Sequence, residues 1–386
     1  MRDTSNECLF QEKGAVVIPE IKTTIRIDRG GLNMNKDWSE KNKKMQSLIG
    51  KKESFDEGID ILLELREDLF GQITSIVNAY PKEAFYRMPF AGAKGYHSKT
   101  LAYSLWHIFR IEDIVTHTLI CQDSQVLFTE DWTRRINSPI VTTGNELKGE
   151  EIAEFSEELD VRALYDYCRA VMDATNEFLR KLQYEDLKRK FTDDDRERLN
   201  ETGSVSKDEE AFWLIDYWCG KDIKGLIQMP FSRHWIMHIE AMCRIKNELC
   251  RKERKGVDPI AYCGLSCNHC FLKEWCGGCR TSYNTCSYAT CNPDRICPNA
   301  ACCKEKGLDG CYDCDGLTGC LIGFYSNGND TNAIKAMAMF IQKHGKKELA
   351  VALDNLHKKY DFQKIQEILG DNLDEGLKIL EENNKY

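Results

Sequence analysis

Apolar side chains recur every three or four residues along four stretches of the first 250 residues, the spacing of a helix with one buried face. These stretches cover residues 54–80, 98–121, 160–182 and 231–249. Ser54 and Glu57 predict a capping box for the first helix, and Asp160 predicts an N-cap for the third. Because no alternating strand pattern separates the stretches, we expect a mainly α protein built on a four-helix bundle.

The rest of the chain predicts two further parts. Connections 122–159 and 183–230 are longer than bundle loops usually are, so we expect short helices within them, such as 211–219. The charged run 251–256 indicates a domain boundary, and residues 331–382 return to helical spacing. A chain of 386 residues exceeds one ordinary core. The expected division is an N-terminal segment 1–50, a bundle 51–252 and a cysteine-rich module with helical tail 257–386.

The N-terminal segment shows few packing signals. Arg29, Gly30 and Gly31 lie just before Met34. Purine-rich codons for that tripeptide would resemble a ribosome-binding site at a suitable distance. We therefore expect translation to begin at Met34, so that residues 1–33 need not be native.

Charge and hydropathy argue against two classes of binding partner, nucleic acids and membranes. A net charge of -9, without a basic stripe that alternates with aromatic residues, argues against nucleic acid. No apolar run is long enough to span a membrane, and the chain opens without a secretion pattern. We therefore expect a cytoplasmic protein.

Cysteine is the strongest chemical signal. Of 19 cysteines, 13 fall between Cys263 and Cys320. In a protein that is not exported, such density indicates metal ligation rather than a disulfide framework. Three Cys-x2-Cys pairs can each clamp a metal from a tight turn. The predicted ligands are Cys263, Cys267, Cys270, Cys276, Cys279, Cys311, Cys314 and Cys320.

Which metal these cysteines bind, and in which groups, stays open at this point. Zinc and iron–sulfur clusters both accept four thiolates. Thirteen cysteines could supply three four-ligand sites with one left over. The additional Cys291, Cys297, Cys302 and Cys303 are ligands of a further site or unligated thiols.

Three histidines form a second candidate site. His234 and His238 are four residues apart, so both project from one face of the last helix, and that face continues as apolar residues. His107 lies on an apolar stripe of the second helix. Buried imidazoles need polar partners. A divalent metal satisfies all three, and neutral imidazole suits zinc, nickel or iron. Hydrogen bonds to backbone or tyrosine are the competing interpretation.

The segment from Leu105 to Asp113, Leu-Trp-His-Ile-Phe-Arg-Ile-Glu-Asp, resembles the second-helix motif of the DinB-like (YfiT-like) superfamily. The resemblance covers about residues 54–250. It implies a four-helix bundle in which His107, His234 and His238 bind a divalent metal. Members include thiol-dependent transferases and hydrolase- or isomerase-like enzymes.

One departure concerns the histidine pair. Many members follow the second histidine with an Arg-Gly-Gln-like stretch, whereas His238 here leads into Ile-Glu-Ala-Met. If His238 were instead the first of the pair, Met242 would replace a ligand and the site would be degraded. We prefer the pair His234 and His238.

Three charged residues follow His107 on the same helix. Arg110 lies one turn further on, and we expect it to contact an anionic group of a substrate, with a surface or interhelix salt bridge as the alternative. Glu112 and Asp113 point away from the His107 face, so structural contacts are expected for both.

Residues 258–350 resemble an uncharacterised bacterial and archaeal cysteine-rich family, on the motifs that begin at Ala261, Gly277 and Lys306. That resemblance implies metal binding and no activity.

Two functions are therefore expected from the sequence. The first is a metal-dependent transferase, using a low-molecular-weight thiol, or a hydrolase of a small molecule, with a cysteine-rich zinc or iron–sulfur module appended. The alternative is a metal or redox sensor in which the bundle is a scaffold. A second copy of the chain is a further candidate partner.

Overall fold

The computed structural model describes residues 34–270, 273, 276–282, 286, 297–326 and 329–385. Within these ranges the protein is mainly helical and has no strand; its only β-type pairings are two isolated bridges, Lys190 with Asp222 and Ile260 with Ser266. The expected α class is thus confirmed. The prediction that translation begins at Met34 concerns residues 1–33, which lie outside the described residues.

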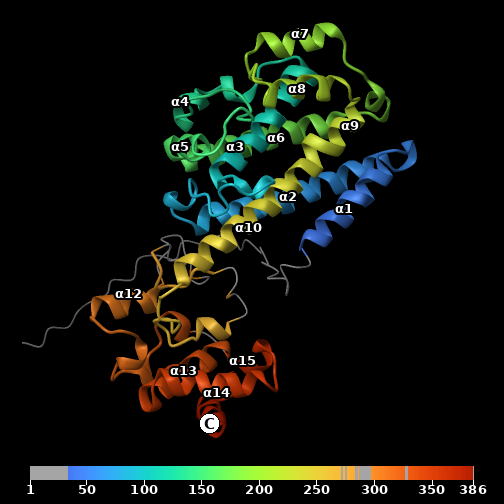
Figure 1. Cartoon of the computed structure of the whole chain (residues 1–386). Coiled ribbons are helices and arrows are strands. Elements are labelled where there is room, and N and C mark those ends of the chain that lie inside the picture. Colours follow the sequence, from blue (N-terminus) through green and yellow to red (C-terminus); the bar gives the residue numbers. More distant parts are fainter. Residues whose placement is uncertain are drawn as a thin grey trace, which may run out of the picture.

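Four long helices correspond to the four apolar stretches. They are α2 (Phe55–Ala79), α3 (Leu101–Asp113), α6 (Val161–Lys181) and α10 (His234–Arg254). All four contribute to one buried apolar core, through residues such as Phe70, Phe109, Val171 and Trp235. Figure 1 shows α10 running from the end of α9 (Ile223–Gln228) past α2 toward the cysteine-rich segment.

Two π-helical segments adjoin these helices. α3 continues into the π-helical segment Ile114–Cys121, and the π-helical segment Met229–Arg233 leads directly into α10. Pro230 has no amide hydrogen to donate, and it lies in the second of these segments. The predicted helices at 98–121 and 231–249 are therefore real but not regular α-helix throughout.

The long connections carry short helices, as expected. Residues 122–159 include α4 (Trp132–Ile136) and α5 (Glu151–Glu158), while residues 183–230 include α7 (Asp193–Glu201), α8 (Glu209–Cys219) and α9. The predicted N-cap of the third helix is confirmed, because the Asp160 carboxylate accepts a hydrogen bond from the Ala163 amide at 2.8 Å.

The predicted capping box at Ser54 is wrong. The Ser54 hydroxyl donates to the Leu48 carbonyl at 3.0 Å, and Glu57 pairs with Lys44 at 3.2 Å. Leu48 and Lys44 belong to α1 (Met34–Leu48), a helix that the apolar pattern did not reveal. Ile49, which directly follows α1, packs against α2 so closely that a Cβ on Gly58 would lie 2.6 Å from its side chain.

The charged run at the predicted boundary is helical for most of its length. α10 ends at Arg254, and Arg251 forms an ion pair with Glu248 at 2.6 Å. Cations in the last turn are favourable because the helix dipole is negative there. The regular helix therefore breaks only after Arg254, where Gly256 adopts a φ of 84°.

The remaining helices follow the cysteine-rich segment. They are α12 (Pro298–Glu305), α13 (Asn329–His344), α14 (Lys346–His357), α15 (Phe362–Gly370) and α16 (Leu373–Asn383). The apolar faces of α13, α14, α15 and α16 share a core with four buried cysteines, Cys263, Cys279, Cys303 and Cys311, of which Cys303 lies in α12. Figure 1 shows these helices grouped beyond the C-terminal end of α10. Among the described residues, no helix combines the length and apolar character needed to cross a membrane.

Candidate metal centre

The structure brings His107, His234 and His238 together. One ring nitrogen from each lies within 4.8 Å of the others, and all three residues are buried. His234 and His238 occupy successive turns of α10, and their ring centroids are 4.6 Å apart. His107 comes from α3, with its ring 5.1 Å from His234 and 4.8 Å from His238. The expected meeting of these histidines is thus confirmed, and Met242 instead lies in the apolar core.

The tautomer of His107 follows from one hydrogen bond. Its Nδ1 lies 2.9 Å from the backbone carbonyl oxygen of Thr143. A carbonyl oxygen can only accept, so Nδ1 carries the proton and Nε2 keeps its lone pair. This is the arrangement that metal-bound histidines use, with one nitrogen oriented by a second partner.

The Thr143 carbonyl belongs to a segment, 141–144, that α3 holds through side chains on one face. Tyr103 donates to the Gly144 carbonyl at 3.1 Å and Trp106 to the Thr142 carbonyl at 2.9 Å. Arg110 donates to the Val141 carbonyl at 2.8 Å. Together with His107, four side chains of one helix thus bind four consecutive carbonyls.

The other two imidazoles lack such partners. Nδ1 of His234 and both ring nitrogens of His238 are buried without a hydrogen-bond partner. Leaving buried polar atoms unsatisfied is costly, and each ring has a lone pair that an ion could use. The donor set and its unsatisfied nitrogens therefore fit a divalent metal bound by three imidazoles.

Burial keeps the three rings neutral. Desolvation lowers the pKa of His107 to about 4, against the opposing effect of its bond to Thr143. It also lowers the pKa of His234 and of His238 well below the ordinary value, and the neighbouring histidines act in the same direction. Neutral imidazole is the form that binds metal.

Aromatic rings enclose the histidines. Tyr103 stacks on His107 with centroids 5.5 Å apart, and Tyr96 meets His238 edge-on at 4.7 Å. Tyr96 is 46% exposed and lines a surface pocket of about 470 Å³ together with Glu240 and Arg244. Tyr96 therefore lies between His238 and solvent, a position that no pattern in the sequence indicates.

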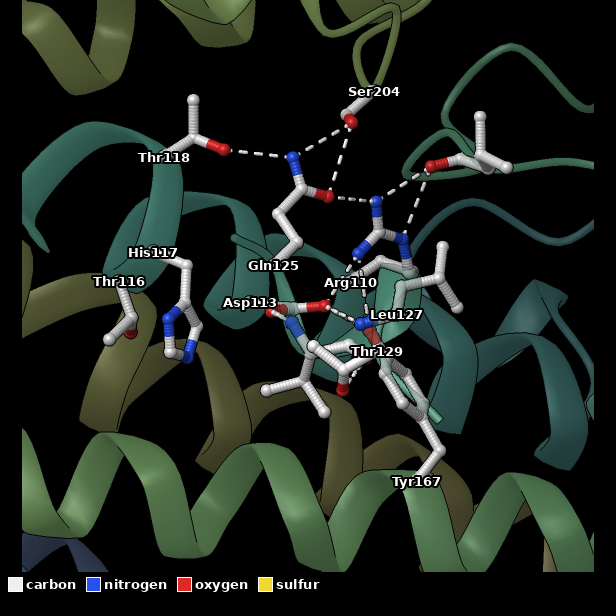
Figure 2. A network of polar contacts seen from close by, with 12 residues as sticks. Arg110, Asp113, Thr116, His117, Thr118, Gln125, Leu127, Thr129, Tyr167 and Ser204 are labelled. Carbon is white, nitrogen blue, oxygen red and sulfur yellow. Dashed lines mark hydrogen bonds and ion pairs between the residues drawn. The ribbon is translucent and has the colours of Figure 1, made fainter. Parts of the chain in front are cut away.

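Arg110 lies in a buried polar network rather than beside the imidazoles (Figure 2). Its guanidinium forms an ion pair with Asp113 at 2.9 Å and donates to the Tyr167 hydroxyl, to Gln125 and to the Val141 carbonyl. All three of its nitrogens are thereby used. The ion pair is buried and joins two residues of α3, so it is neither the surface nor the interhelix salt bridge that was the alternative. The contact of Arg110 with a substrate stays a prediction.

Both acidic residues near Arg110 make structural contacts, as expected. Asp113 also accepts from the Val126 and Leu127 amides at 2.7 and 3.0 Å, which fixes the chain beyond the π-helical segment. Glu112 pairs with Arg66 of α2 at 2.6 Å and accepts from the Trp235 indole of α10 at 2.8 Å. Through these two contacts Glu112 of α3 links α2 to α10, the helix that carries His234.

The described cysteines of the module line two different pockets. The first pocket includes five of the predicted ligands together with two additional cysteines: Cys263, Cys267, Cys270, Cys276, Cys279, Cys286 and Cys297. The second includes the other three predicted ligands together with two additional ones: Cys302, Cys303, Cys311, Cys314 and Cys320. The structure thus divides the described cysteines into two groups, a division that their spacing in the sequence does not predict. Cys291 lies outside the described residues.

The most buried thiols of the second pocket are in contact. Sγ of Cys303 and Sγ of Cys311 are 3.6 Å apart. Hydrogen bonds from Cys303, Tyr325 and Asn299 lower the pKa of Cys311 below its usual range, against the effect of burial. The same contact with Cys311, together with burial, raises the pKa of Cys303.

Comparisons with known proteins add no relative. No protein-family model matches the chain. No curated protein and no solved structure matches it either. The resemblances therefore rest on the sequence motifs, and the geometry of the residues is the basis for any functional proposal.

Proposed function

We propose that α2, α3, α6 and α10 form a DinB-like four-helix bundle whose three histidines bind one divalent ion, and that the protein is a metal-dependent enzyme. The reaction is transfer to or from a small molecule with a low-molecular-weight thiol, or hydrolysis of a small molecule. The observation that carries this proposal is the buried meeting of His107, His234 and His238, with unsatisfied ring nitrogens on two of them.

Three imidazole ligands are the number typical of catalytic rather than structural sites, because they leave a coordination position for a substrate. A divalent ion bound there supplies Lewis acidity that activates a nucleophile at neutral pH. The protein contributes orientation. The Thr143 carbonyl holds the proton on Nδ1 of His107, and the successive turns of α10 fix His234 and His238 on one face.

The residues around the histidines control the access of water to the rings and the charge of the substrate that can bind. Tyr103 and Tyr96 shield two of the rings from water. The Lys99 ammonium lies over the Tyr103 ring, 4.9 Å from its centroid, and its charge acts on both His107 and His238. A cation at this position favours a substrate or thiol in its anionic form, because opposite charges attract more strongly where water is excluded.

The test is metal content of the full chain in three forms: wild type, His234→Ala and His117→Ala. His117 continues the helix that carries His107 but pairs with Asp123 at 2.7 Å, so it is the matched control. We expect His234→Ala to lose one divalent ion per chain and His117→Ala to lose none. Circular dichroism checks that both variants fold. Unchanged metal content in folded His234→Ala would refute the site.

The enzyme proposal needs a second readout. Wild type and His234→Ala are compared in thiol-transfer assays with small electrophiles and in ester or amide hydrolysis assays. An activity that needs added metal and disappears in His234→Ala supports an enzyme. A metal-loaded wild type that is inactive in both classes would contradict the stated reactions.

The two cysteine-lined pockets favour a second candidate, a metal or redox sensor with the helical bundle as scaffold. This function requires the cysteine sites to exchange metal reversibly and the rest of the chain to respond. Hydrogen exchange of α10 with and without metal in the cysteine sites tests it. Identical protection in both states would exclude the sensor.

A further inference from the structure

We propose that Lys99 selects the substrate of the candidate metal centre, and that its ammonium binds a carboxylate of a small molecule whose reacting group lies at the three histidines. This inference rests on the proposed function and deepens it, because it names the residue that recognises the substrate and the chemical class that this residue takes. The class is small molecules, thiols included, that carry a carboxylate close to the reacting atom.

Lys99 lies between two segments that contact the histidines. It directly follows the short 3₁₀ helix that begins with Tyr96, whose ring meets His238 edge-on at 4.7 Å. It also lies just before α3, whose Tyr103 ring stacks on His107 at 5.5 Å. The Lys99 ammonium itself lies 4.9 Å from the centroid of the Tyr103 ring. The side chain is therefore at the edge of the imidazole cluster, and its charge adds to burial in lowering the pKa of His107 and of His238.

The Lys99 ammonium has no direct counterion among the described residues, because no carboxylate oxygen of theirs lies within 4.0 Å of its nitrogen. The residue is half-buried, and desolvation lowers the pKa of Lys99 against a smaller opposing attraction from Glu210. Asp208, which precedes Glu210 by two residues, is paired with Lys148 at 3.8 Å. Partial burial of a charge without a partner is costly. A carboxylate of a bound molecule would supply the missing partner.

Arg110, the other cation of this region, is already occupied. Each of its three guanidinium nitrogens donates to an acceptor within the protein, namely the Val141 carbonyl, Asp113 and Gln125. A substrate anion could replace these acceptors only by breaking a buried network. The Lys99 ammonium, in contrast, has three donors and needs no such rearrangement.

The charges around Lys99 favour a carboxylate over a phosphate. Phosphate is typically bound by several donors together, often the planar fork of an arginine. Two acidic side chains also lie nearby. Glu210 acts on Lys99, and Glu146 adds to burial in raising the pKa of Tyr103. Their negative charges repel a dianion about twice as strongly as a monoanion.

Binding at two points would orient the substrate. The reacting group is held at the histidines and the carboxylate at Lys99, so that the molecule has one preferred direction in the site. Tyr96 and Tyr103 enclose the imidazoles, and exclusion of water strengthens the attraction between opposite charges.

Two thiols that differ in one group test this assignment. The first, 3-mercaptopropionate, carries a carboxylate, and the second, 3-mercaptopropionamide, has a neutral amide of the same shape. Each is titrated into the full-length protein loaded with Co²⁺, where a thiolate that binds the ion gives a sulfur-to-cobalt absorption band. His234→Ala, loaded in the same way, gives the absorption of cobalt bound by cysteines, which is subtracted.

Lys99→Gln removes the ammonium, and Lys94→Gln is the matched control because it removes the same charge from an exposed position of the preceding loop. We expect Lys99→Gln to bind 3-mercaptopropionate about tenfold more weakly than wild type, the effect typical of losing a hydrogen bond to a charged group. Its affinity for the amide, and both affinities of Lys94→Gln, should match wild type. An unchanged affinity of Lys99→Gln for the carboxylate, or equal weakening for both thiols, would overturn the assignment.

The wild type supplies a second measurement, which covers the outcome in which Lys99→Gln fails to fold. We expect wild type to bind the carboxylate more tightly than the amide. Equal affinities would overturn the inference and leave the metal centre intact. Absorption that is the same in wild type and in His234→Ala would instead refute the metal centre itself, so the two failures are distinguishable.

Discussion

The His107 imidazole donates a hydrogen bond from Nδ1 to the carbonyl oxygen of Thr143, 2.9 Å away. The acceptor is a backbone atom, so its position depends on how segment 141–144 is held. Tyr103, Trp106 and Arg110 bind the neighbouring carbonyls from the same helix that carries His107. The helix thus orients its own metal-binding candidate through a loop that it fixes in place.

A substitution in this loop is expected to weaken metal binding without touching a histidine. Gly144 has a φ of 77°, and a Cβ there would lie 3.1 Å from the Tyr103 ring. Gly144→Ala should therefore displace the carbonyls around Thr143. Loss of such orienting partners typically lowers metal affinity by roughly 10–100-fold. Competition with a chromophoric chelator measures the dissociation constant.

Gly149→Ala is the matched control for Gly144→Ala. Gly149 also has a positive φ, 55°, but a Cβ there would meet nothing within 4 Å. Both variants carry backbone strain, and only Gly144→Ala crowds the site. Equal metal affinities in the two variants would show that the position of segment 141–144 does not matter to the metal.

The buried ion pair Arg110–Asp113 is expected to contribute strongly to stability. Both side chains are 0% exposed, so Arg110→Met would leave the Asp113 carboxylate without its cation. Breaking a buried pair in this way typically costs about 3–5 kcal/mol in the free energy of unfolding. Urea denaturation measures the loss. Arg134→Met is the control, because Arg134 and Asp131 have the same spacing but are 81% and 56% exposed.

An exposed pair contributes about 1 kcal/mol or less, so Arg134→Met should unfold close to the wild-type urea concentration. If Arg110→Met were no less stable than Arg134→Met, the network in Figure 2 would not stabilise the fold.

The sequence predicted the long helices because each buries a broad apolar face, as the stripe from Ile59 to Val77 in α2 illustrates. The apolar pattern did not reveal α1, because this helix is mostly polar and its buried apolar side chains, such as Trp38 and Met45, are far apart. The capping box failed for the same reason, since the partners that divert Ser54 and Glu57 belong to α1.

The histidines were predictable because a spacing of four residues fixes a shared helix face whatever surrounds it. Their orientation was not, since the Thr143 carbonyl carries no residue-type signal and its position arises from tertiary hydrogen bonds. The same holds for Arg110, whose partners Gln125 and Tyr167 come from other parts of the chain. Grouping of the cysteines likewise depends on where α12 packs against the turns that carry Cys311.

The metal-free protein is expected to lose stability between about pH 6.5 and pH 4. An unfolded histidine takes up a proton near pH 6.5, whereas burial lowers the pKa of folded His107 to about 4. Between these values the unfolded chain binds more protons, so acid favours unfolding. Above about pH 6.5 both states of His107 are neutral, and its contribution no longer depends on pH.

Urea midpoints of chelator-treated protein at about pH 7 and about pH 5 measure this dependence. In His107→Gln the dependence should weaken by up to about 1.4 kcal/mol per pH unit, the contribution of one proton. An unchanged dependence would mean that His107 does not titrate between its unfolded and folded pKa values.

Tyr96 is expected to limit the access of solvent to the metal. Its ring meets His238 edge-on at 4.7 Å while 46% of the residue is exposed, so truncation would open a route from the surface pocket to the imidazole. We therefore expect a chelator to remove metal several-fold faster from Tyr96→Ala than from wild type. Tyr360, on the C-terminal side of α14 and 42% exposed, supplies the control Tyr360→Ala. Wild-type rates in both variants would mean that the metal is reached by another path, and Tyr96 would then only pack against His238.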